Sequence, residues 1–245
     1  MKRVAPGSQA EQVGRLFIAG VLVVFAPLLP LGNYLIYPFM IVGTWFHEMG
    51  HGLTALALGH DFQRLLIFPD GSGVAESLTP ANIPAWQRAM IAAGGPLGPS
   101  VMGMALMLAS ARARLWRPAL LVLATIVMLS TLVWVRTLTG WIVLPAIAAG
   151  LALLAWRGKP GMVRFMLQFL GMLAGLSMFL SWDYLFTENA VIGGQLMLSD
   201  TGAIEASLLL PHWVWALLLV GSATLMIGGS LKYALRGERG RLPRS

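Results

Sequence analysis

The chain has 245 residues, of which 57% are hydrophobic and 11% charged, and its mean hydropathy is +0.75. This composition is too apolar for an ordinary soluble domain and indicates a protein embedded in lipid. The formal net charge of +7 does not indicate nucleic-acid binding, because Lys and Arg fall mostly in short connections and the C-terminal tail. The chain has no cysteine, which excludes disulfides and thiolate metal sites, so a transition metal would need His, Asp and Glu ligands.

Apolar runs that reach or approach the length of a bilayer crossing alternate with short polar connections. They cover residues 16–31, 34–59, 90–110, 119–135, 141–156, 165–186 and 213–235. The pattern predicts an all-α polytopic membrane protein of six or seven transmembrane helices. It forms one domain over 1–245, with tails at 1–12 and 236–245. The first run is short and contains Pro27 and Pro30, so it is either a full crossing or a kinked, re-entrant element.

Basic residues bear on the orientation of these helices without fixing it. The connections at 112–117 and 157–164 and the tail from Lys232 onward carry Lys and Arg, which favours one cytoplasmic side for all three. Seven full crossings would put the basic N-terminus on the opposite side. A first segment that does not cross would remove this conflict, and the sequence leaves the orientation open.

Two connections are long enough to carry structure of their own. In the first, residues 62–68 and 74–78 flank the turn sequence Pro69-Asp70-Gly71, which predicts a short β-hairpin after the second apolar run. The second, at 187–210, contains acidic residues but no Lys or Arg. We expect it to be a partly ordered loop on one membrane face.

The second apolar run ends with the sequence His47-Glu48-Met49-Gly50-His51. Histidines four residues apart share one face of a helix about one turn apart, so His47 and His51 can clamp one metal ion. Glu48 is rotated by about 100° from His47, which puts its carboxylate beside the metal and within reach of a bound water. The pattern predicts a zinc site with Glu48 as general base. The alternative is a set of polar helix-interface residues or a proton path.

Catalytic zinc takes three protein ligands and leaves one position for water, so a third ligand must come from elsewhere in the chain. We expect Asp183, because among the acidic residues outside the motif it lies near the end of a long apolar run. Its neighbours Trp182 and Tyr184 are also typical of a membrane interface, and Glu188 is the alternative ligand. Three other acidic residues look loop-borne: Asp70, Asp200 and Glu205.

Glycines open the third strong apolar run, at 90–110. Gly94 and Gly98 form a pair of small residues at helical spacing, which lets another helix approach closely. We expect that helix to be the one that bears His47 and His51. Packing is therefore the main role predicted for these glycines.

These residues resemble the site-2 protease family of intramembrane zinc metallopeptidases, and more closely its small bacterial membrane-peptidase branch. The resemblance rests on the motif at 47–52, the hairpin at 69–74, the helix start Gly95-Pro96-Leu97 and Asp183. It implies one zinc ion bound by His47, His51 and Asp183, with Glu48 activating the water. The better-known members present the third ligand in an Asn-Pro-Asp-Gly or Leu-Asp-Gly context, whereas Tyr184 follows Asp183 here.

The sequence therefore predicts an intramembrane zinc metalloendopeptidase, which cleaves membrane-anchored proteins by zinc-activated water, and the resemblance implies a bacterial cell membrane. A transmembrane helix must unwind before it is cut, and residues 62–68 could hold the extended segment as an edge strand. An adaptor protein or a second copy of the chain could help to select the substrate. Two alternatives remain, a transporter that relays a cation or proton and a pseudoprotease that binds transmembrane partners without cutting.

Overall fold

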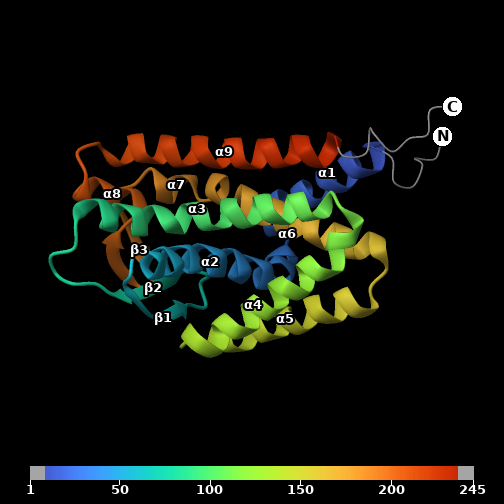
Figure 1. The fold of residues 1–245 in the computed structure, drawn as a ribbon, viewed down its shortest axis with the longest axis horizontal. Coiled ribbons are helices and arrows are strands. Elements are labelled where there is room, and N and C mark those ends of the chain that lie inside the picture. Colours follow the sequence, from blue (N-terminus) through green and yellow to red (C-terminus); the bar gives the residue numbers. More distant parts are fainter. Residues whose placement is uncertain (1–8, 237–245) are drawn as a thin grey trace.

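The computed structural model describes residues 9–236, in which long helices run side by side and small hairpins gather at one end (Figure 1). The long helices are α1 (Gln9–Phe25), α2 (Gly32–Ala57), α3 (Ala85–Ser110), α4 (Trp116–Trp134), α5 (Leu138–Arg157), α6 (Pro160–Leu180) and α9 (His212–Arg236). The shorter elements are η1 (Ala26–Leu28), β1 (Asp61–Ile67), β2 (Gly73–Leu78), η2 (Ala113–Leu115), α7 (Trp182–Leu185), β3 (Asn189–Ile192), β4 (Gln195–Leu198) and α8 (Asp200–Ser207). Of the expected tails, residues 1–8 and 237–245 lie outside the described range.

The long helices confirm an all-α polytopic fold. Five helical stretches among the described residues are long and apolar enough to cross a membrane: Ala85–Ser110, Ala113–Trp134, Leu138–Arg157, Pro160–Leu180 and His212–Leu235. The first two expected spans correspond to α1 and α2. Helix α2 has 26 residues, but the polar motif lies within it, and the apolar part of α1 is only Val13–Phe25. The break expected in the first apolar run is present, because α1 ends at Phe25 and η1 follows.

A buried tryptophan sets the rotation of α2. Trp45 is 1% exposed, and its indole Nε1 donates a hydrogen bond to Ser130 Oγ on α4 at 2.9 Å. Trp45 precedes His47 by two residues, so the two side chains point about 200° apart around the helix. Packing of the tryptophan face against α4 therefore turns the histidines toward the other side, where α3 lies.

Glycines bring α2 and α3 into close contact, as the sequence predicted. A Cβ on Gly50 would lie 2.2 Å from the carbonyl oxygen of Gly94, and one on Gly98 would lie 2.7 Å from that of Phe46. Any larger residue would force the two backbones apart. The histidine-bearing helix is thus held directly against the glycine-rich start of α3.

The predicted hairpin is confirmed as β1 and β2, an antiparallel pair in which Leu65 faces Ala75. The outer edge of β1 is occupied: Leu65 O accepts a hydrogen bond from Arg136 N at 3.0 Å, and Ile67 N donates one to Thr137 Oγ1 at 3.1 Å. The expectation that residues 62–68 offer an edge to a substrate is therefore wrong. In this two-stranded sheet the edge without a partner strand belongs to β2.

Candidate metal centre

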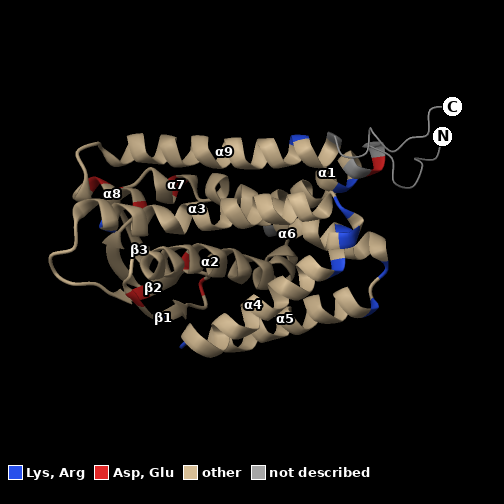
Figure 2. Cartoon of the chain, in the orientation of Figure 1, with Lys and Arg blue, Asp and Glu red and all other residues tan. Residues whose placement is uncertain are grey.

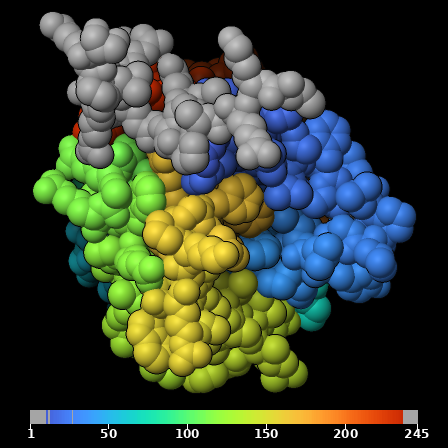
Figure 3. Space-filling view, turned by 90° about the vertical axis from the view of Figure 1, so that its right-hand side faces the viewer, coloured from blue at the N-terminus to red at the C-terminus, as the bar shows by residue number. Residues whose placement is uncertain are grey.

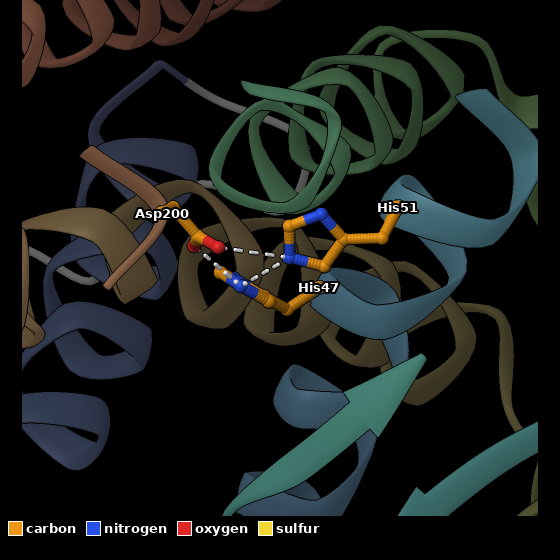
Figure 4. A group of neighbouring side chains, drawn as sticks. All are labelled: His47, His51 and Asp200. Atoms are coloured by element: carbon orange, nitrogen blue, oxygen red, sulfur yellow. Dashed lines mark hydrogen bonds and ion pairs between the residues drawn. The ribbon is translucent and has the colours of Figure 1, made fainter. Parts of the chain in front are cut away.

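Helix α2 and the start of α8 bring two histidines and one aspartate together, as Figure 4 shows. His47 Nε2 lies 2.9 Å from Asp200 Oδ2, and His51 Nε2 lies 3.1 Å from Asp200 Oδ1. The two Nε2 atoms are 3.2 Å apart. Residues that are 149 positions apart in the chain thus converge on one point.

The three side chains fit a metal ion. Tetrahedral zinc with bonds of about 2.0–2.1 Å separates its ligand atoms by about 3.3 Å, close to the separations here. Asp200 Oδ2 is buried and, although it is near His47 Nε2, it accepts no aligned hydrogen bond. A buried carboxylate oxygen without such a partner is costly unless a cation or proton satisfies it. Two imidazoles and one carboxylate are also ligands that suit zinc.

The tautomer of His51 is set by α3. Its Nδ1 lies 2.7 Å from the carbonyl oxygen of Ile91, which can only accept a hydrogen bond, so Nδ1 carries the proton. Nε2 then presents its lone pair to the site, the arrangement typical of a metal-binding histidine. Gly95 makes room for this ring, since a Cβ there would lie 2.1 Å from His51 Nε2.

Asp200 is positioned by the cap of α8. Ser199 Oγ accepts a hydrogen bond from Gly202 N at 3.0 Å, and Thr201 Oγ1 donates one to Leu185 O at 2.7 Å. The second contact fastens the start of α8 to the end of α7. Burial alone would raise the pKa of Asp200, but His51 and His47 outweigh it and hold that pKa below its ordinary range.

The structure does not bring Asp183, the third ligand expected from the sequence, to the two histidines; it brings Asp200 instead. Helix α6 ends at Leu180, and the side chain of Asp183 is exposed on α7, outside the group of ligand atoms. The alternative, Glu188, is exposed as well. Asp200 was missed because the stretch around it looked like a loop. The available signal was a serine cap followed by an acidic residue at a helix start.

Tyr184, next to Asp183, does reach the site. Its ring lies 6.3 Å from the ring of His47 in an edge-on arrangement, and its hydroxyl lies close to Asp200. Burial raises the pKa of Tyr184, and the charges of Asp200 and Glu48 raise it further. The hydroxyl therefore keeps its proton and can donate a hydrogen bond to the Asp200 carboxylate. Sequence reasoning had treated this tyrosine only as an interfacial aromatic.

Glu48 lies beside the metal ligands and against β2. The residue is 6% exposed, and its carboxylate lies near the backbone N–H of Ala75 on β2. A Cβ on Gly73 would lie 2.8 Å from Glu48 Cγ, so only glycine permits this contact. The motif carboxylate thus stands between the ligand group and the outer edge of the strand.

A cavity of about 350 Å³ opens in front of these groups. His47, Glu48 and Tyr184 line it, together with side chains of α3 and α6 and the tips of both hairpins. The tips touch each other, because Gly193 N donates a hydrogen bond to Ser72 Oγ at 3.2 Å. The space is large enough for a few residues of an extended peptide.

Comparison with known families agrees with this geometry. Residues 17–230 match the Peptidase M50B-like family. The chain belongs to this family. The match covers α2 with its motif and α8 with Asp200, and it confirms the resemblance to the site-2 proteases. No curated protein and no solved structure shows significant similarity to the chain. Family membership and the apolar helices identify the M50B-like protein as a multi-pass membrane protein of a metallopeptidase class.

Proposed function

We propose that this M50B-like protein is an intramembrane zinc endopeptidase that cleaves membrane-anchored proteins. One zinc ion is held by His47, His51 and Asp200, with Asp200 in place of Asp183. The observation that carries the proposal is the convergence of two Nε2 atoms and one carboxylate at 2.9–3.2 Å, with Glu48 buried beside them.

The chemistry follows from the positions of the side chains. Zinc bound here would supply Lewis acidity, polarising the scissile carbonyl and lowering the pKa of a water toward neutrality. The Glu48 carboxylate accepts a proton from the attacking water and returns it to the leaving amine. The Ala75 N–H lies near that carboxylate, and the Tyr184 hydroxyl, which lies close to Asp200, is placed to orient it.

The free edge of β2 is suited to hold an extended substrate. Leu65 and Ala75 face each other, and the Leu65 carbonyl points away from β2. By the alternation of an antiparallel ladder, the Ala75 backbone groups point away from β1, toward Glu48. A peptide added to this edge would run past the general base and the metal ligands. We therefore assign to β2 the substrate-binding edge that the sequence led us to expect at residues 62–68.

The test is Glu48→Gln in purified full-length protein. Glutamine keeps the size of the side chain but cannot take a proton, and it leaves His47, His51 and Asp200 unchanged. We expect cleavage of a single-span test protein with a Gly-Pro break in its span to fall by roughly 10²–10⁴-fold. Zinc content, measured by elemental analysis, should stay the same. Undiminished cleavage by Glu48→Gln would refute the mechanism, and a zinc-loaded parent that cuts nothing would favour a pseudoprotease.

A further inference from the structure

Charged residues divide between the two ends of the bundle, as Figure 2 shows. The structure describes the side chains of eleven Lys and Arg residues. Eight of them belong to α1, to the α3–α4 and α5–α6 connections with the adjoining helix ends, or to the last turns of α9, which Figure 1 places at one end of the bundle: Arg15, Arg112, Arg114, Arg117, Arg157, Lys159, Arg164 and Lys232. The remaining three are Arg64, Arg88 and Arg136, toward the metal centre. Among the described acidic residues, all except Glu11 lie in the half that holds the metal centre. We call the first end the basic end.

Contacts between elements join the basic connections into one face. Arg117, at the start of α4, donates hydrogen bonds at 2.8 Å to backbone carbonyls at the end of α5. Arg112 donates one to the hydroxyl of Tyr233 on α9 at 2.6 Å. Arg15 on α1 reaches the carbonyl of Gly161 at the start of α6. Figure 3 looks onto this face, where the connections around residues 112 (green) and 160 (yellow) lie near α1 (blue).

Seven full crossings would put the start of the chain on the side opposite the basic connections. The structure removes this conflict, because the first apolar run does not form a full crossing. The apolar part of α1, Val13–Phe25, would extend about 20 Å as a helix, less than the roughly 30 Å of a hydrocarbon core. Gly20 faces Met172 in the middle of α6, and the chain then turns at η1 into α2. Helix α1 therefore does not cross on its own. It enters from the basic end, and α2 continues to the end that carries the metal centre (Figure 1).

Exposed tryptophans mark a membrane interface at the metal-centre end. Trp86, Trp182 and Trp213, at the starts of α3, α7 and α9, are about half exposed. Tryptophan favours the level of the lipid headgroups, where its ring is buried and its N–H stays wet. Tyr184, on the same short helix as Trp182, reaches the metal ligands. The metal centre therefore lies close to the interface opposite the basic end.

We propose that the basic end faces the cytoplasm and that the metal centre opens toward the non-cytoplasmic side of the membrane. Lys and Arg in short connections are retained on the cytoplasmic side during insertion, and eight of the eleven described basic side chains lie at the basic end. If the protein is the protease proposed above, its substrates are segments that enter from the non-cytoplasmic leaflet. The sidedness itself does not depend on proteolysis.

The absence of native cysteine makes the sidedness directly measurable. Ala113→Cys in η2 and Gln195→Cys in β4 are matched variants, each at an exposed, uncharged position outside the catalytic machinery. The full chain would be treated with a membrane-impermeant maleimide in right-side-out and inside-out bacterial membrane vesicles, with the cysteine-free parent as blank. We expect Gln195→Cys to be labelled only in right-side-out vesicles and Ala113→Cys only in inside-out vesicles. The reverse pattern, or labelling of each variant in both preparations, would overturn the proposal.

A pair of substrates tests the second half of the inference. Two single-span proteins of identical composition would carry a Gly-Pro break near either the non-cytoplasmic or the cytoplasmic end of the span. We expect the first to be cut at least 10-fold faster by the parent enzyme. Faster cutting of the second would refute the substrate class while the labelling result stands. Failure to cut either, with zinc bound, would refute the proposed function instead and leave the sidedness intact.

Discussion

The two ends of the bundle are built differently. At the basic end, the helices are joined by short connections, and arginines cap backbone carbonyls such as those at the end of α5. At the other end lie two hairpins, the short helices α7 and α8, and the metal ligands. Irregular backbone is tolerated near a membrane where it is buried in protein or lines a cavity, and the tips of both hairpins line the cavity here. The helices thus provide the scaffold, and the connections at one end provide Asp200, the free edge of β2 and part of the cavity wall.

The largest expected effect is on zinc binding, and it distinguishes Asp200 from Asp183. Asp200→Asn should weaken zinc binding by more than 100-fold, because it removes a ligand, whereas even outer-shell partners are worth roughly 10–100-fold. Asp183→Asn is the matched control and should bind zinc as the parent does. Competition with a chromogenic chelator measures both. Zinc loss in Asp183→Asn with retention in Asp200→Asn would restore the assignment made from the sequence.

A glycine substitution sharpens the contrast between the metal centre and the remaining scaffold. Gly95→Ala should lower zinc affinity by roughly 10–100-fold, because its Cβ would lie 2.1 Å from His51 Nε2 and must displace the ring. Gly150→Ala on α5 has no neighbour within 4 Å and serves as control. It should leave zinc affinity unchanged. Equal affinity in both variants would mean that the His51 ring is not held against Gly95.

Tyr184→Phe should have a smaller effect on the same centre. Phenylalanine lacks the hydroxyl that lies close to Asp200, and it leaves the ring packed near His47. We expect zinc affinity to fall by about 10-fold, at the low end for partners that orient a ligand. The midpoint of thermal unfolding of the zinc-free protein should not change. A lower midpoint with unchanged affinity would assign the tyrosine a packing role only.

The smallest expected effect concerns the hydrogen bonds between Glu205 on α8 and His212 on α9. Glu205 Oε2 accepts hydrogen bonds from His212 N at 2.8 Å and His212 Nδ1 at 2.7 Å. The bond from the His212 backbone, followed by that from its side chain, lowers the pKa of Glu205. The ionised Glu205 carboxylate therefore stabilises the folded state at pH values above the ordinary glutamate pKa of about 4.3. This stabilisation is lost as the pH falls through the lower pKa that Glu205 has in the folded protein. Glu205→Gln should melt slightly earlier than the parent at pH 7, and this difference should shrink in acid.

The local features were determined by the sequence alone. His47, Glu48 and His51 lie within five residues of one helix, so helical periodicity fixes their relative positions. The hairpin followed from its turn residues, because Asp70 accepts hydrogen bonds from Ser72 and Gly71 adopts a positive φ of 89°. The apolar runs likewise predicted the helices that form the membrane scaffold.

Only the tertiary structure decided which distant residues meet these local features. Asp183 and Asp200 are both acidic residues near helix ends, and their sequence context favoured the first. The direction in which α7 and α8 leave the bundle exposes Asp183 and buries Asp200 against the histidines. The free edge of the hairpin belongs to β2 and not to β1 for a similar reason, since the segment after α4 occupies the outer side of β1. Contacts between residues far apart in the chain depend on how whole helices and strands pack, so local spacing in the sequence does not predict them.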